Sequence, residues 1–274
     1  MRKITAFSIV LILFLLASCG ESPVMKKIGP VSYKVSSPEV TEVSDRKMDV
    51  IFRRDDRYIE GKILLPEGGG PHPVIVMSTG LYALYPEYER KARGFVEGGF
   101  AVLLFNYVSN EDANSDKIVK DQDLKGLMAS QAEDLSAVID SLPKIRGLDT
   151  SRVYLWGHSY GGMISAYVGC QRQDEIKGLI LVEPSLDKAA TELIPGDEST
   201  MVDICKDLEQ CNLNTVIFVG SKSSAGEDTH TYDEAMEALL FGELITIDGA
   251  DHLFAGEYGD KMVERSIKCI RSWE

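Results

Sequence analysis

A short glycine-rich motif holds the residue of this sequence best suited to nucleophilic chemistry. The stretch Gly157-His158-Ser159-Tyr160-Gly161-Gly162 contains the pattern G-x-S-x-G. It follows an apolar run and precedes a run typical of a helix, which is the strand-turn-helix setting that the pattern requires. Glycines are needed in such a sharp turn because the strained backbone brings neighbouring chain too close for side chains. The motif therefore predicts that Ser159 is presented in the open as a nucleophile.

A serine hydroxyl is a weak nucleophile, so a base must lie within hydrogen-bond reach, and histidine titrates in a suitable range. Three of the four histidines lie in less suitable settings, namely a Pro/Gly turn, the motif itself and a polar stretch: His72, His158 and His230. His252 instead follows the last apolar run, Leu244 to Ile247. That position is a loop at the carboxyl edge of the predicted sheet, where ligands bind. We therefore predict that His252 is the base.

Apolar runs and helical patterns alternate along the chain and predict the framework that positions these residues. Continuous apolar runs of strand length, as expected for parallel strands covered on both faces, occur at residues 74–77, 101–105, 153–156, 179–182, 216–219 and 244–247. Residues 58–65 add a strand with an alternating pattern. Helical patterns occupy residues 87–97, 121–142, a stretch from about 162, and 260–273. This alternation predicts an α/β fold with a mostly parallel, doubly wound sheet and helices on both faces.

The sequence GHSYGG, the histidine after the last strand and the order of the strands together resemble the α/β-hydrolase family. The resemblance extends over about residues 50–273. It implies the α/β-hydrolase fold and two main-chain donors for an oxyanion. One is the amide of Tyr160, directly after the nucleophile. The other comes from the loop at residues 78–81, where Thr79-Gly80 replaces the family's usual His-Gly, and we expect the amide of Leu81 to serve.

The family also implies an acidic residue between the serine and the histidine in chain order. At the usual place, a few residues past Gly220, this sequence has Ser223 instead of an aspartate. We assign the acid to Asp228, with Glu227 as the next choice and Glu183 as the third. The acid orients the imidazole and stabilises its cation. The missing aspartate is therefore expected to affect catalytic efficiency more than the fold.

Within the family, the sequence is most similar to dienelactone hydrolases, prolyl-oligopeptidase-like enzymes and relatives of acyl-CoA thioesterases and bile-acid acyltransferases. These resemblances imply hydrolysis of a carboxylic ester or thioester through an acyl-Ser159 intermediate, with a small-molecule acyl substrate and no cofactor. The alternatives are a serine peptidase of the prolyl-oligopeptidase-like type and a non-catalytic binding lipoprotein with the same fold. The cysteines lack metal-ligand spacing with nearby histidines, so no metal is expected.

The N-terminus has the charge, apolar run and small residues of a secretory signal. Arg2 and Lys3 precede an apolar run from Ile4 to Leu16, which is shorter than the ~20 residues of a membrane-spanning helix. Leu16-Ala17-Ser18-Cys19 resembles the lipobox of bacterial lipoproteins. That resemblance implies a lipid on Cys19 and an exported, membrane-anchored protein that faces the periplasm or the cell exterior.

We therefore divide the chain into a signal peptide (1–18), a tether with an entry strand (19–47) and an α/β-hydrolase domain (48–274). The polar and acidic segment 184–214 is predicted to form a short cap. Cys205 and Cys211 could close a short loop there, whereas buried thiols are expected at Cys170 and Cys269.

The formal net charge of −14 argues against nucleic acid as a partner, because phosphate binding needs a basic surface.

Overall fold

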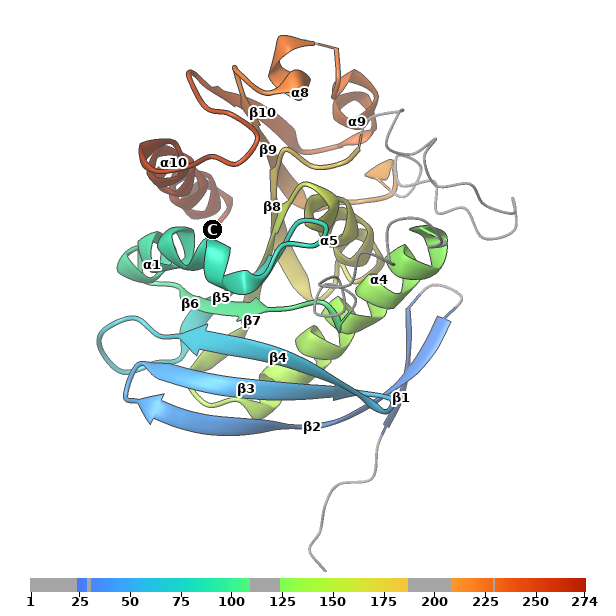
Figure 1. Cartoon of the computed structure of the whole chain (residues 1–274), viewed down its shortest axis with the longest axis vertical. Coiled ribbons are helices and arrows are strands. Elements are labelled where there is room, and N and C mark those ends of the chain that lie inside the picture. Colours follow the sequence, from blue (N-terminus) through green and yellow to red (C-terminus); the bar gives the residue numbers. More distant parts are fainter. Residues whose placement is uncertain (1–23, 29–30, 109–123, 187–207, 229) are drawn as a thin grey trace, which may run out of the picture.

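A single sheet runs through the centre of the protein (Figure 1). The computed structural model describes residues 24–28, 31–108, 124–186, 208–228 and 230–274. Within them the sheet has 10 strands, which neighbour one another in the order β1-β2-β3-β4-β6-β5-β7-β8-β9-β10.

The second part of the sheet is parallel. Its strands are β5 (His72–Ser78), β6 (Ala101–Phe105), β7 (Leu148–His158), β8 (Ile176–Val182), β9 (Asn214–Gly220) and β10 (Gly242–Ile247). Every neighbouring pair among them runs parallel. All six coincide with the predicted apolar runs, and most of their residues are buried because helices cover both faces. The predicted α/β fold class is confirmed.

The first part of the sheet is antiparallel and begins earlier than expected. It consists of β1 (Val24–Ile28), β2 (Val31–Ser44), β3 (Lys47–Arg54) and β4 (Arg57–Leu64), and β4 also pairs antiparallel with β6. The expected entry strand before Met48 is thus present as two strands, β1 and β2, which pair with each other and, through β3, with the rest of the sheet, so the sheet begins earlier than the predicted start of the domain. Only one face of β2 is covered, so its Ser, Lys and Glu residues hide the strand pattern.

Two pairs of helices form the outer layers (Figure 1). Helices α1 (Glu89–Glu97) and α10 (Glu257–Trp273) cover one face, and α4 (Leu124–Ser141) and α5 (Tyr160–Gln171) cover the other. Each pair encloses its own buried apolar cluster against the sheet. Shorter helices lie at η1 (Tyr85–Tyr88), η3 (Leu142–Lys144), α8 (Ser224–Glu227) and α9 (Asp233–Ala238).

Several expectations fall outside the described residues. These are the signal peptide 1–18, the lipidated Cys19, most of the predicted cap at 184–214 and Cys205. Cys211 is buried, and Cys170 and Cys269 are buried thiols, as expected. None of the helices in the described ranges is long and apolar enough to cross a membrane.

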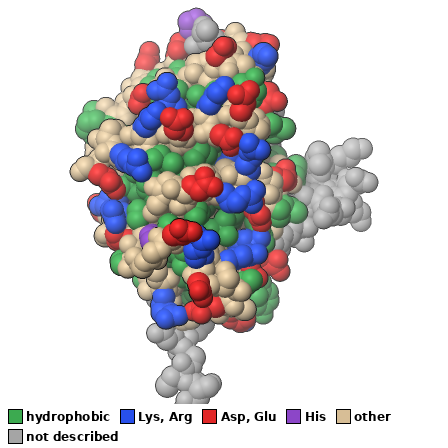
Figure 2. All heavy atoms as spheres, turned by 90° about the vertical axis from the view of Figure 1, so that its left-hand side faces the viewer, with side chains coloured by type: hydrophobic (Ala, Val, Ile, Leu, Met, Phe, Trp, Pro, Cys, Tyr) green, Lys and Arg blue, Asp and Glu red, His purple; other side chains and the backbone are tan. Residues whose placement is uncertain are grey.

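The face that carries α1 and α10 shows acidic and basic side chains intermingled (Figure 2). Exposed ion pairs account for part of this pattern. Arg90 pairs with Asp260 at 2.7 Å, and Lys268 pairs with Glu264 at 2.6 Å. Such exposed pairs contribute little to stability, because water and salt screen them.

A buried ion cluster fastens the antiparallel strands to α4. The Arg54 guanidinium at the end of β3 lies 2.6 Å from the Asp134 carboxylate and also contacts Glu133. Arg54 is 3% exposed and Asp134 is fully buried. Asp134 also accepts a hydrogen bond from the Val108 amide. Burial raises the pKa of Asp134 to about 6 against the opposing effect of Arg54, so the pair is charged at pH 7.5.

We predict that Asp134→Ala lowers the free energy of unfolding by about 3 kcal/mol at pH 7.5, because it leaves a buried guanidinium short of one partner. The matched control is Asp260→Ala, which removes an exposed ion pair and is expected to cost less than about 1 kcal/mol. Urea denaturation of both variants measures the difference. Equal effects would show that the buried cluster does not stabilise the fold.

Candidate active site

Ser159 lies at a sharp bend between β7 and α5. Its backbone has φ 55° and ψ −123°, a conformation that non-glycine residues rarely adopt. Four backbone hydrogen bonds hold the bend: the Ser159 amide donates to Val182 O, and Ser159 O accepts from the amides of Gly162, Met163 and Ser185. The strain is thus maintained by the neighbouring strand and helix, and Ser159 is presented half-exposed at the start of α5.

The glycines of the motif are explained by close backbone approaches around this bend. A Cβ atom on Gly161 would lie 2.2 Å from Thr79 O, at the end of β5. A Cβ atom on Gly157 would lie 2.4 Å from Gly161 O. Both distances are far below van der Waals contact, so the first turn of α5 fits against the sheet only with glycine at these positions.

Strained residues gather at the carboxyl edge of the parallel strands. The non-glycine residues of the described ranges with positive φ are Asp55, Tyr82, Ser159, Glu183 and Phe254. All but Asp55 lie in loops that follow parallel strands, namely β5, β7, β8 and β10. Strain of this kind costs about 1–3 kcal/mol per residue and is concentrated at functional sites. This edge of the sheet is therefore the candidate active site.

His252 reaches this edge in the loop after β10. Its carbonyl oxygen lies 2.8 Å from His158 Nε2, and the two imidazole rings are 4.8 Å apart. Since His158 directly precedes Ser159, the loop that carries His252 is fastened beside the serine bend. The His252 side chain is 47% exposed. No hydrogen bond joins its ring to the Ser159 hydroxyl in this structure.

Glu183 supplies the carboxylate beside His252. It follows β8 directly, and its Oε2 lies 3.5 Å from His252 Nδ1. Its Oε1 accepts hydrogen bonds from the Gly220 amide at 2.6 Å and from the Ser223 hydroxyl at 2.7 Å. Glu183 is 3% exposed. One oxygen is therefore anchored to the loop after β9, and the other faces the imidazole.

These contacts keep the buried carboxylate charged. Burial by itself raises the pKa of Glu183, but His252, the Gly220 amide and the Ser223 hydroxyl outweigh burial and hold the pKa below its ordinary value. An ionised carboxylate next to Nδ1 favours the histidine tautomer with the proton on Nδ1, which leaves Nε2 to act as a base.

The assignment of the acid to Asp228 is corrected by this geometry. Asp228 is exposed at the end of α8, and its carboxylate accepts a hydrogen bond from the His230 amide. Glu227 is exposed on α8 as well. The third choice, Glu183, is the one beside His252. The order of catalytic residues in the family favoured the loop after β9. The position of Glu183 directly after the apolar run of β8 would have indicated the carboxylate beside His252.

Ser223, which stands where the family has an aspartate, supports the acid instead of replacing it. Its hydroxyl donates to Glu183 Oε1. The loop that contains Ser223 is also bonded to the loop that contains His252, because the Lys222 amide donates to Ala250 O at 2.8 Å. Sequence reasoning assigned no role to Ser223, because nothing in the pattern indicates that a carboxylate from the preceding strand reaches it.

The predicted oxyanion donors lie on either side of Ser159. Tyr160 opens α5, so its amide belongs to the first turn of that helix. The loop after β5 passes close to the serine, since a Cβ atom on Gly80 would lie 3.6 Å from Ser159 Cβ. The Gly80 amide donates to the Tyr88 hydroxyl, and no described residue accepts a hydrogen bond from the amide of Leu81. The roles of the Leu81 and Tyr160 amides as oxyanion donors stay a prediction.

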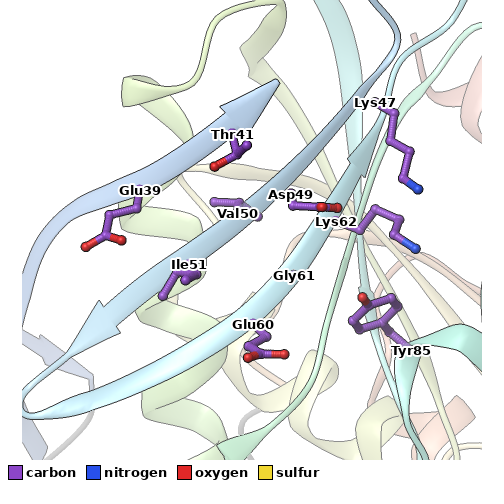
Figure 3. Close-up of a pocket in the computed structure, with 10 residues that line it drawn as sticks. All are labelled: Glu39, Thr41, Lys47, Asp49, Val50, Ile51, Glu60, Gly61, Lys62 and Tyr85. Atoms are coloured by element: carbon purple, nitrogen blue, oxygen red, sulfur yellow. The ribbon is translucent and has the colours of Figure 1, made fainter. Parts of the chain in front are cut away.

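A groove of about 370 Å³ on the outer face of the antiparallel strands is separate from this edge (Figure 3). Charged side chains such as Glu60 and Lys62 line it, together with Tyr85. None of the predicted catalytic residues contributes to its wall. We therefore locate the candidate site at the carboxyl edge and not in this groove.

Comparisons with known proteins agree with this architecture. The family described as alpha/beta hydrolase fold matches residues 82–206. Two curated proteins, each named "Uncharacterized 31.7 kDa protein in traX-finO intergenic region" from Escherichia coli, are 32% identical over 117 residues. That match covers 39% of this chain and 37% of each relative, so the chain spans well under half of their length.

Solved structures resemble the chain over most of its length. A dienelactone hydrolase from Anabaena variabilis ATCC 29413 has 16% identity and a TM-score of 0.62, covering 88% of this chain and 98% of that one. Est1E from Butyrivibrio proteoclasticus has 14% identity and a TM-score of 0.64, with 81% and 99% covered. An acetyl xylan esterase from Paenibacillus sp. R4 has 15% identity and a TM-score of 0.65, with 84% and 88% covered. The chain therefore has the α/β-hydrolase fold.

Proposed function

We propose that the protein is a serine hydrolase that cleaves a carboxylic ester or thioester through an acyl-Ser159 intermediate. One observation carries the proposal: a strained serine, a histidine and a buried carboxylate lie in loops at the same edge of the sheet, and His252 Nδ1 is 3.5 Å from Glu183. Separately, the lipobox resemblance supports export and anchoring through Cys19, which lies outside the described residues.

The reaction follows from the roles of these groups. His252 Nε2 takes the proton of the Ser159 hydroxyl as Oγ bonds to the carbonyl carbon of the substrate. The amides of Leu81 and Tyr160 donate to the resulting oxyanion. His252 then gives the proton to the departing alcohol or thiol, and the carbonyl–leaving group bond breaks. Water, deprotonated by His252, releases the acid and restores the Ser159 hydroxyl, while Glu183 stabilises the imidazolium each time.

The nature of the acyl bond is supported by the structural neighbours. One structure of Est1E from Butyrivibrio proteoclasticus holds ferulic acid, and the Paenibacillus protein is named an acetyl xylan esterase. An ester substrate fits both descriptions. The non-catalytic alternative rested on the missing aspartate and on the altered oxyanion loop, and Glu183 beside His252 speaks against the first of these grounds.

We expect a fluorophosphonate probe to label the wild-type protein on Ser159 and to leave Ser159→Ala unlabelled, because the activated hydroxyl attacks phosphorus as it attacks a carbonyl. Mass spectrometry of the labelled peptide identifies the residue, and Ser165→Ala is the control, since Ser165 lies buried one turn further along α5. An unlabelled but folded wild-type protein contradicts the proposal.

We also predict that Glu183→Gln lowers kcat for p-nitrophenyl esters by about 10³- to 10⁴-fold, since it removes the negative charge beside His252. Asp228→Asn, the matched control in an exposed position, is expected to leave kcat unchanged. The opposite pattern restores Asp228 as the acid. Parallel assays with aminoacyl-anilides separate a peptidase, which also cleaves the anilides, from an esterase, which cleaves only the esters.

A further inference from the structure

A chain of hydrogen bonds runs beneath the site and is not used by the chemistry described above. His158 Nε2 lies 2.8 Å from His252 O, and His158 Nδ1 lies 2.9 Å from the Tyr88 hydroxyl. The Tyr88 oxygen accepts from the Gly80 amide at 3.1 Å. Both side chains are buried, with 5% exposure each. The chain thus connects the loops after β5 and β10 through the residue that precedes Ser159.

Only one arrangement of protons satisfies every group in this chain. The His252 carbonyl can only accept, so the His158 proton resides on Nε2. Nδ1 is then an acceptor, and the Tyr88 hydroxyl must donate to it. The Tyr88 oxygen remains available for the Gly80 amide. This arrangement needs a neutral imidazole, and burial lowers the pKa of His158 to about 4, although the His252 carbonyl opposes the shift.

Packing keeps the chain of hydrogen bonds rigid. The Tyr88 ring meets the Trp156 ring edge-on at 5.6 Å, and the His158 ring stacks on Trp156 at 6.4 Å. A Cβ atom on Gly80 would lie 3.3 Å from His158 Nδ1, so the loop after β5 lies directly against the imidazole. Side chains held on both faces have few alternative rotamers, and the loops bound to them share that constraint.

The histidine loop has a second fastening on the same side. Lys91 of α1 donates from Nζ to Leu253 O at 3.1 Å, and its ammonium lies 5.6 Å from the centre of the Tyr88 ring. A hollow of about 280 Å³ lies between α1 and residues 253–256, and Tyr88 and His158 form part of its wall. Contacts on this side therefore fix the backbone of His252 while its imidazole extends toward Glu183.

We propose that His158 and Tyr88 are positioning residues: their hydrogen bonds hold the loops of the oxyanion donor and of the catalytic histidine in register with Ser159. The proposal rests on the proposed function for its catalytic consequence. The Gly80 amide is occupied by Tyr88, which orients the following peptide so that the Leu81 amide is left for the oxyanion. His158 donates a hydrogen bond to the His252 carbonyl, and this bond fixes the backbone position from which the His252 imidazole extends. Neither residue contacts the substrate.

Tyr88→Phe tests the proposal, because it removes only the hydroxyl and keeps the ring. We expect kcat for a p-nitrophenyl ester to fall by about 10- to 100-fold with little change in KM, since misplaced groups reduce the rate of the chemical step. The second-order rate of fluorophosphonate labelling is expected to fall by a similar factor. Tyr154→Phe is the matched control: its hydroxyl donates to Glu274 at 3.3 Å and makes no hydrogen bond to His158 or Gly80, and its ring also belongs to the aromatic core. Unchanged kcat and labelling in Tyr88→Phe overturn the proposal.

A pair of His158 variants gives an independent test. His158→Gln can place its amide N–H near the position of Nε2, within reach of the His252 carbonyl, whereas the shorter amide of His158→Asn lies near the position of Nδ1, beside Tyr88, and does not reach that carbonyl. We expect the Gln variant to retain more of kcat than the Asn variant when both have equal thermal stability. A merely structural role predicts that kcat follows stability and not the retained donor, and that result overturns the proposal.

Nuclear magnetic resonance separates a failure of this proposal from a failure of the proposed function. In ¹⁵N spectra of the wild-type protein, we expect neutral His158 at pH 7 with its proton on Nε2. An Nδ1-protonated or charged His158 overturns the proposal, whatever the enzyme activity. If the spectra agree but the wild-type protein hydrolyses no ester and takes no label, the hydrogen-bonded chain stands as a structural feature and both the proposed function and the positioning role fail.

Discussion

The bend at Ser159 is the constraint on which the rest of this site depends. The chain leaves β7 and enters α5 within one residue, and that residue takes a backbone conformation that an isolated serine would avoid. The strain persists because the first turn of α5 lies against the end of β5, at distances that exclude any side chain on Gly161. The Ser159 amide also donates to Val182 O, and Ser159 O accepts from the Ser185 amide, so both sides of the bend are fixed. A rigid sheet therefore supports a strained residue that presents a hydroxyl.

Two buried ionisable groups next to this bend end in opposite states, one charged and one neutral. Glu183 is buried, yet three hydrogen-bond donors or positive partners keep its pKa low, so it remains a carboxylate. His158 is buried among aromatic rings and a carbonyl group, so its pKa falls to about 4 and it remains neutral. The cost of transferring a charge from water decides both cases, since only a group with enough compensating partners keeps its charge. The site thus obtains a fixed anion and a fixed neutral donor within a few ångströms of His252.

The two halves of the sheet contribute differently. Parallel strands end at a common edge, so residues from β5, β7, β8 and β10 meet there although they are far apart in the sequence. The antiparallel strands carry no predicted catalytic residue. They extend the sheet, and the buried pair of Arg54 and Asp134 fastens them to α4. The serine bend itself follows β7, which lies between β5 and β8 in the parallel part of the sheet.

The sequence by itself determined the parallel strands, the order of strands and helices, and Ser159 and His252 as the candidate nucleophile and base. Continuous apolar runs and glycine spacing are local properties, so they can be read without knowledge of contacts. Residues 24–44 were harder to interpret, because a strand with one polar face and scattered serines has little local pattern.

Only the tertiary structure places Glu183, and not Asp228, beside His252, and only it shows the contacts of Ser223, Tyr88 and His158. Asp228 lies closer to His252 in sequence, but the twist and order of the strands bring the end of β8 to the imidazole and leave α8 exposed. The tautomer of His158 depends on a carbonyl 94 positions away. Distances between loops are set by how the whole sheet packs, and no local pattern of residues encodes them.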